Sequence, residues 1–221
     1  MALVVLVLSA CAPATITKKQ AFPEMYEKKP VSLLVLPPIN QSTAAEAKDY
    51  FNSTIAEPLT MKGYYVYPLE VVSELLASEG FPDTELLLNV PATKFRETFG
   101  ADAVMFITIN SWNTTYIVLG GSVTVALTFD LKSTLTGETI WRYKDSLTVD
   151  TSGGNSGPGM AGLLLKAVAT AIKTATTDYV PIARQLNYIA TTGLPAGKYH
   201  PLNNKDMEDK VISNKVTVKA N

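Results

Sequence analysis

Residues 31–38 have the sequence "VSLLVLPP", and this stretch decides the class of the fold. The run 31–36 is almost entirely apolar, and Pro37 and Pro38 stop it. A continuous apolar run of this length predicts a strand that is covered on both faces, as in a parallel or mixed sheet. We therefore expect residues 31–36 to form an inner strand of an α/β domain.

Helical and strand patterns alternate after this run. Helices are predicted where apolar residues recur every three or four positions, and strands where short apolar runs end at glycine or proline. The predicted helices cover 43–62, 70–79, 91–99 and 160–176 with a further piece to about 187, and the predicted strands cover 64–68 and 103–109. In the helix 70–79, Val72, Leu75 and Leu76 are expected to face the core.

Residues 123–149 follow a period of two. Val123, Val125 and Leu127 alternate with polar residues, and Thr136 and Gly137 mark a turn. This pattern predicts an antiparallel hairpin with one buried and one solvated face. The complete order of elements predicts a single three-layer α/β/α domain with a mixed sheet, in which parallel strands lie beside an antiparallel meander.

The chain begins with "MALVVLVLSAC", in which an apolar run leads into small residues and the only cysteine, Cys11. This order is typical of a signal peptide. The tetrad "LSAC" resembles the bacterial lipobox, whose cysteine is lipidated and becomes the mature N-terminus. The alternative is an N-terminal strand that ends in a buried cysteine. Because residues 12–30 are polar and rich in proline and lysine, we favour lipidation followed by a tether.

Four segments follow from this interpretation. They are a signal peptide (1–10), the lipidated cysteine with a flexible tether (11–30), the α/β domain (31–192) and an extended or disordered C-terminal tail (193–221). Acyl chains on Cys11 would hold the domain at a membrane without a transmembrane helix. In lipoproteins of this kind an aspartate after the cysteine signals inner-membrane retention. Ala12 occupies that position here and favours the outer membrane, with the domain facing the periplasm.

Composition excludes several classes of function. Nineteen basic and twenty acidic residues give a net charge of −1, which lacks the basic footprint of a nucleic-acid binder. One cysteine and one histidine supply no cluster for a metal ion, and no cofactor motif is complete. The sequence therefore predicts neither a metal nor a cofactor.

A glycine-rich segment, "SGGNSGPG" at 152–159, is the strongest indication of ligand chemistry. Gly153, Gly154, Asn155, Ser156 and Gly157 lie between a predicted strand and a predicted helix, where backbone N–H groups can hold an anion. A P-loop would need lysine after the last glycine, and a nucleophile elbow would need glycine in place of Pro158. A surface loop is the simpler interpretation. The alternatives are a ligand- or nucleotide-binding protein and a serine hydrolase that uses His200 as its base.

Other candidate residues have simpler structural explanations. His200 could cap a backbone turn or a small pocket, but an ordinary surface histidine is the simpler interpretation. Trp112 and the tyrosines near residue 65 could form a binding patch, but aromatic residues in strands more often belong to the core. Pore formation by the hairpin is disfavoured, because Lys132 and Arg142 lie on its outer face. The sequence therefore predicts a protein that is not an enzyme.

Five phrases together resemble a family of bacterial lipoproteins that is catalogued as domain of unknown function seven-nine-nine. They are "VLPPIN" (35–40), "PLTMKGYYVYP" (58–68), "FGADAVMFITINSW" (99–112), "TGETIW" (136–141) and "GLPAGKYHP" (193–201). Members of that family resemble the N-terminal domain of TolB and, more distantly, the CsgG lipoproteins. Their genes often lie beside the gene of a CsgG-like lipoprotein.

The resemblance implies an α/β/α domain on the periplasmic face of the outer membrane, and it carries over no catalytic residue. It further implies association with itself or with a CsgG-like lipoprotein. Together with the lipobox it predicts a non-enzymatic interaction module that supports an envelope export or assembly complex.

Overall fold

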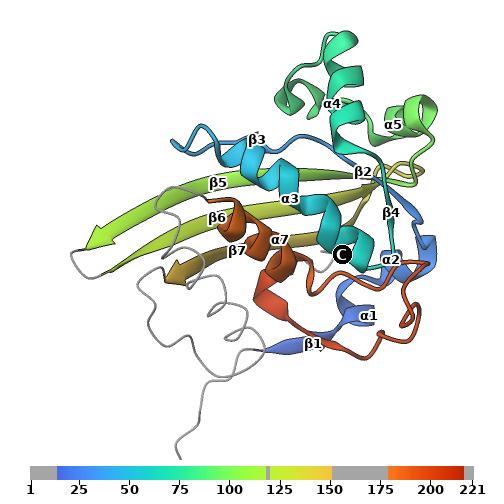
Figure 1. Cartoon of the computed structure of the whole chain (residues 1–221). Helices are drawn as coiled ribbons and strands as arrows, with labels where there is room; N and C mark the ends of the chain where they lie inside the picture. The colour runs from blue at the N-terminus through green and yellow to red at the C-terminus, as the bar shows by residue number, and fades with distance from the viewer. Residues whose placement is uncertain (1–13, 118–119, 151–178, 217–221) are drawn as a thin grey trace, which may run out of the picture.

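The structure is a computed structural model, and it describes residues 14–117, 120–150 and 179–216 (Figure 1). A six-stranded mixed sheet forms its centre, with the strand order β4-β2-β5-β6-β7 and with β3 also paired to β5. The strands are β2 (Ser32–Val35), β3 (Ile39–Asn40), β4 (Tyr65–Val66), β5 (Ala103–Ile117), β6 (Gly120–Ser133) and β7 (Thr139–Asp150). The pairings of β2 with β4 and of β2 and β3 with β5 are parallel, whereas β5, β6 and β7 form an antiparallel meander. The predicted mixed sheet is confirmed.

Helices lie on both faces of this sheet. On one face, α3 (Ala47–Met61) packs against α7 (Val180–Thr191), and both cover a core that includes Leu33 and Val35. On the other face, α4 (Leu69–Ser78), the short 3₁₀ helix η1 (Thr84–Leu87) and α5 (Ala92–Phe99) cover a second core that includes Leu34 and Leu36. Successive side chains of a strand point to opposite faces, so a strand between two helical layers has to be apolar throughout. This explains why the run at 31–36 has no polar alternation.

Asp102 holds the start of β2 against β5. Its carboxylate accepts hydrogen bonds from the N–H groups of Val31 (3.0 Å) and Ser32 (3.1 Å) and from the Ser32 hydroxyl (3.1 Å). Burial alone would raise the pKa of Asp102, but these donors outweigh it and hold the pKa below its ordinary value. The ionised carboxylate therefore fixes the register at which the parallel strands begin.

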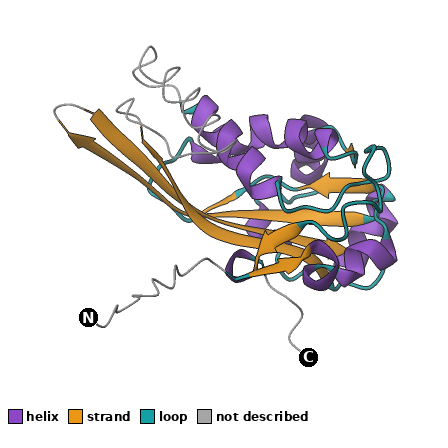
Figure 2. Ribbon diagram, turned by 90° about the horizontal axis from the view of Figure 1, so that it is seen from below, coloured by secondary structure: helices purple, strands orange, loops and turns teal. Residues whose placement is uncertain are grey.

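The meander is covered more fully on one face than on the other. Inward side chains such as Val125 and Phe129 are fully buried. On the opposite face, Thr124 and Thr148 form a hydrogen bond of 2.9 Å, and Arg142 pairs with Asp130. Figure 2 shows the far ends of β5 and β6 extending beyond the described helices. This confirms the hairpin with one apolar and one polar face.

Residues 14–30 and 193–216 form a unit that we call the terminal module. Its β1 (Thr15–Thr17) pairs antiparallel with β8 (Lys210–Ile212), and a 3₁₀ turn, η2 (Ser213–Lys215), follows. The helices α1 (Lys18–Ala21) and α2 (Pro23–Lys28) follow β1 in the chain. Residues 193–209 have no regular helix or strand. Hydrogen bonds such as that from the Gly197 N–H to the Lys62 carbonyl (2.8 Å) hold them against the rest of the domain.

The described residues of these two segments correct the expectation of a flexible tether at 11–30 and an extended or disordered tail at 193–221. Phe22 is 1% exposed and lies 6.3 Å from Trp141, measured between ring centroids. Thr17 and Gln20 form a capping box that starts α1. A few buried side chains and the pairing of two distant segments are therefore enough to order a stretch whose composition is mostly polar.

Candidate functional site

The predicted site residues Cys11, Gly153, Gly154, Asn155, Ser156 and Gly157 lie outside the described residues, and both assignments stay predictions. His200 is described. Its Nδ1 accepts a hydrogen bond from the N–H of Leu202 (3.1 Å), so the side chain caps a backbone turn. The structure thus supports the turn cap over the favoured sequence interpretation of an ordinary surface histidine.

A buried ion pair joins the two ends of the chain. Lys18 Nζ lies 2.9 Å from Asp206 Oδ2, and the two side chains are 7% and 2% exposed. The Tyr26 hydroxyl donates to Asp206 Oδ1 (3.1 Å), and the Ala196 N–H donates to Oδ2 (2.9 Å). We call Lys18, Tyr26 and Asp206 the terminal clamp.

The electrostatics of the terminal clamp favour an ionised Asp206. Burial by itself would raise the pKa of Asp206, but the Lys18 ammonium and the Ala196 N–H outweigh it, so the pKa lies below its ordinary value. Burial and the nearby Asp206 charge raise the pKa of Tyr26, which keeps its hydroxyl protonated as a donor. Both oxygens of Asp206 already accept hydrogen bonds. The carboxylate thus holds the fold together and is not a free catalytic base.

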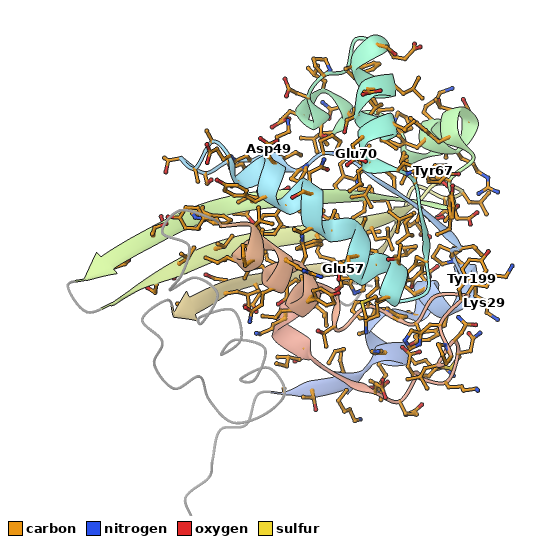
Figure 3. The ribbon with its side chains drawn as sticks, in the orientation of Figure 1. Lys29, Asp49, Glu57, Tyr67, Glu70 and Tyr199 are labelled. Carbon is orange, nitrogen blue, oxygen red and sulfur yellow. The ribbon has the colours of Figure 1, made fainter. Side chains whose placement is uncertain are left out.

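A small pocket of about 260 Å³ lies beside the terminal clamp, between α2 and the segment 195–204. Tyr64 lines it and donates its hydroxyl to the Pro195 carbonyl (2.7 Å). Lys29 is also part of its wall, and Figure 3 shows Lys29 close to Tyr199 at this end of the molecule. Because Tyr26 and Tyr64 already have partners within the fold, we interpret this pocket as a packing gap.

Two glycines explain why the sequence motifs at 58–68 and 193–201 occur together in this chain. Gly63 has a φ of +82°, and a Cβ atom at this position would lie 2.3 Å from the His200 nitrogen. A Cβ atom on Gly197 would lie 2.5 Å from the Gly63 carbonyl oxygen. The backbones meet so closely that neither position has room for a side chain. These motif residues are therefore structural.

An apolar concavity lies between α4, η1 and α5. We call it the α4–α5 groove, and its volume is about 340 Å³. Phe95, at 3% exposure, lies in its wall together with Leu87. The remaining residues that line it are Leu75, Leu76, Glu79, Phe81, Val90, Lys94, Thr98 and Phe99. The groove therefore offers apolar and aromatic surface with few polar groups.

Five exposed apolar side chains lie on the segment from α4 to the residue after η1, and two of them, Leu75 and Phe81, line this groove. Between 38% and 59% of the surface of each is accessible, and they are Val71, Leu75, Phe81, Leu86 and Leu88. The prediction that Leu75 faces the core is wrong, because 40% of it is exposed. Large apolar side chains scattered singly on a surface need no explanation, but a group around one groove marks an interaction site.

The segment from α4 to the residue before α5 carries charge of one sign, although Lys94 of α5 also lines the groove. Residues 69–90 contain five carboxylates and no lysine or arginine. Glu70, Glu74, Glu79 and Glu85 are exposed, and Asp83 pairs with Lys48 at 3.2 Å. Glu70 extends from α4 in Figure 3. An apolar groove with an acidic rim favours an apolar and basic partner over an anionic ligand.

Residues 14–117, 120–150 and 179–216 offer neither a membrane span nor a metal cluster. No helix in these ranges is both long and apolar enough to cross a membrane. Within the same ranges, no three side chains of His, Cys, Asp or Glu are grouped so that they could hold a metal ion. The groove and the terminal module are thus the features that remain to be explained.

A family model described as "Putative lipoprotein GNA1162-like" matches residues 21–194. The chain belongs to this family. The GNA1162-like match includes β2 to β7 and the whole α4–α5 groove, and it ends before Asp206. Membership indicates a lipid-anchored membrane location. The match begins after Cys11, and the lipidation of this residue stays a prediction.

Two relatives strengthen the GNA1162-like assignment. "Putative lipoprotein NMB1124/NMB1162" from Neisseria meningitidis serogroup B is 33% identical over 176 residues, which cover 79% of this chain and 80% of that protein. The crystal structure of lipoprotein GNA1162 from Neisseria meningitidis is 32% identical, with a TM-score of 0.54, and the match covers 66% of this chain and all of that one. Both relatives are described as lipoproteins, and neither name indicates an enzyme. The resemblance to a family of bacterial lipoproteins is thus confirmed at the level of a lipoprotein family.

Sequence reasoning missed both the terminal clamp and the α4–α5 groove of this GNA1162-like protein. No local pattern could pair Lys18 with Asp206, because 188 positions separate them. The groove did leave a signal in the sequence. Helix 70–79 and the residues after it hold more apolar side chains than one buried stripe can use, and Val71 and Leu86 are two of them.

Proposed function

We propose that the protein is an outer-membrane lipoprotein that faces the periplasm and acts as a non-enzymatic interaction module in an envelope export or assembly complex. Acyl chains on Cys11 form its anchor. The lipobox, the lipoprotein family and Ala12 after the cysteine support this location. The engagement of Asp206 by three donors supports a structural role for the best-buried carboxylate.

The observation that carries this proposal is the α4–α5 groove. Its exposed leucine and phenylalanine side chains lose contact with water when a partner docks, which is the main favourable term in association. The acidic rim selects a partner that presents lysine or arginine beside its apolar residues. We propose that the occupant is a basic amphipathic segment of another envelope protein, with a CsgG-like lipoprotein as the first partner to test.

Site-specific photocrosslinking in the native host tests this docking site. A photoreactive amino acid at Leu86, which is 56% exposed in η1 and adjoins the groove-lining Leu87, should capture a discrete partner. The matched control is Leu135, which is 64% exposed in the turn between β6 and β7 and should capture none. Leu75→Asp should abolish the product, because it places a charge in the groove wall.

Each outcome of the crosslinking experiment has a definite consequence. A single product that depends on Leu75 supports the proposal, and mass spectrometry identifies the partner. A product between two copies of this chain would replace the envelope partner with self-association. Equal capture from Leu86 and Leu135 would overturn the groove as the docking site.

The anchor requires its own experiment. Intact mass and membrane fractionation should show a triacylated Cys11 in the outer-membrane fraction, and the Cys11→Ala variant should leave that fraction. The expression plasmid should include the codons upstream of Met1. An unmodified Cys11 in a protein that retains Met1 would overturn the lipoprotein assignment, and the glycine-rich segment 152–159 would then be the next site to test for ligand binding.

A further inference from the structure

The point at which the lipid anchor joins the domain lies next to β1. This strand begins at Thr15, so residues 12–14 separate it from Cys11. An extended chain advances about 3.3 to 3.6 Å per residue, so the Cα atoms of Cys11 and Thr15 are at most about 14 Å apart. With Cys11 acylated, β1 therefore has to lie close to the lipid headgroups.

Three exposed lysines surround this strand. The N–H of Lys19 donates to the Met207 carbonyl (3.0 Å), which places α1 beside the turn that carries Lys205. Lys210 lies opposite Thr17 in the pairing of β1 with β8. Among the described residues, none of these three lysines takes part in an ion pair. Their charges are thus directed to the surroundings of the domain.

The charge of this region is opposite to that of the groove. Residues 14–30 and 193–216 contain eight lysines and five carboxylates, although the whole chain has a net charge of −1. Two of these carboxylates, Asp206 and Asp209, already pair with Lys18. Asp209 and Glu208 are exposed carboxylates of this part of the chain, and the three exposed lysines outnumber them. A net positive surface therefore faces the side from which the anchor leaves.

We propose that Lys19, Lys205 and Lys210 bind the phosphate groups of anionic phospholipids and hold the terminal module against the membrane. The proposal rests on the proposed acylation of Cys11 for its location, since the acyl chains bring these lysines to the headgroups of the same leaflet. Long lysine side chains reach a charged interface while their methylene stems stay on the protein. Clusters of basic residues beside a lipid anchor add to its membrane affinity.

This contact fixes an orientation as well as an affinity. In Figure 1, α4 and α5 lie at the top of the molecule, and β1 and α1 lie at the bottom. When the terminal module rests on the membrane, the α4–α5 groove points away from it. The acidic rim also favours this orientation, because anionic headgroups repel it. The lysines thus present the groove to a partner on the far side.

Vesicle sedimentation with the full chain carrying Cys11→Ala separates this surface from the anchor. The protein should bind vesicles of phosphatidylcholine mixed with phosphatidylglycerol, and it should not bind pure phosphatidylcholine. The triple variant Lys19→Gln, Lys205→Gln, Lys210→Gln should bind 10- to 100-fold more weakly, on the order of what three surface lysines contribute. Added salt should reduce the binding of the parent protein.

The matched control is the triple variant Lys48→Gln, Lys94→Gln, Lys132→Gln. It removes the same charge from α3, α5 and the end of β6 that lies over Phe106, which are away from β1. It should bind like the parent, and thermal melting should show that both triple variants are folded. Equal losses in the two triple variants, or equal binding to both kinds of vesicle, would overturn the proposal.

A second measurement uses the acylated protein on the same vesicles. Hydrogen exchange should show membrane-dependent protection of residues 15–21 and 205–212, and the first triple variant should lose it. If Cys11 is acylated and this protection is absent, the proposal that the three lysines bind lipid headgroups fails, and the proposed lipid anchor is retained. If Cys11 is never acylated but the Cys11→Ala protein still binds vesicles through the lysines, the proposed lipid anchor fails, and the proposed headgroup-binding surface is retained.

Discussion

The terminal module and the region from α4 to α5 lie at opposite ends of the protein and are stabilised in opposite ways. The terminal module consists of short elements joined by a buried ion pair and by close glycine contacts. The other region is held by an apolar core, and it leaves five large apolar side chains in solvent. In the terminal module, buried polar groups thus hold distant segments of the chain together. In the region from α4 to α5, the exposed apolar side chains are available for binding.

The largest expected effect comes from breaking the terminal clamp. Asp206→Ala leaves the buried Lys18 ammonium with only its longer contact to the exposed Asp209 (3.4 Å), and loss of one member of a buried pair costs about 3 to 5 kcal/mol. Urea denaturation measures the free energy of unfolding. Glu208→Ala, an exposed position in the same turn, should change it by less than about 0.5 kcal/mol. Equal values for the two variants would mean that the clamp does not stabilise the module.

The next largest effect is expected at the glycine contact. Gly63→Ala combines a positive φ with a clash against the His200 backbone, and we expect a loss of about 2 to 4 kcal/mol. Gly80 has a φ of +89°, and a methyl group at this position would meet no atom within 4 Å. Gly80→Ala should therefore cost only the backbone strain, about 1 kcal/mol. Thermal melts of the two variants should differ accordingly, and a larger loss at Gly80 would contradict the packing explanation.

A smaller effect is expected from acid. The pKa of Asp206 is lowered in the folded protein, so its contribution to stability is complete above the unfolded pKa of about 3.9 and is lost as the pH falls through the folded value. The free energy of unfolding of the parent should therefore exceed that of Asp206→Asn at neutral pH. The difference should shrink as the pH falls below about 4. A difference that is independent of pH would exclude the ionised carboxylate as its cause.

The smallest effect on stability is expected at the groove. Leu86→Ser changes an exposed side chain and should alter the free energy of unfolding by less than about 0.5 kcal/mol. Leu76→Ala, at a position only 7% exposed, should cost about 2 kcal/mol or more. Partner capture from a photoreactive amino acid at Leu88, which is 50% exposed, should be lost in Leu86→Ser although the protein remains stable. If partner capture instead falls in proportion to the free energy of unfolding of the variants, Leu86 is not part of the docking surface.

Sequence patterns predicted the central sheet because the period of buried residues is a local property. The run at 31–36 and the alternation from Val123 both became strands of the main sheet. Residues 14–30 and 193–216 gave no such periodic signal, since their folded structure depends on the contact between Lys18 and Asp206, which are far apart in the sequence. The same limit applies to the groove, whose leucines look like core residues until the layers are placed in space.

The pairing of β1 with β8 has a consequence for the order of folding. The Ser213 N–H and hydroxyl both reach the Ala14 carbonyl, across 199 positions of sequence. A chain that emerges from a ribosome or a translocation channel N-terminus first presents β1 when β8 has not yet appeared, and contacts between distant segments form late. β1 thus stays unpaired and open to other proteins until residue 213 has emerged. Closure of the terminal module then becomes possible only once every element of the central sheet has emerged as well.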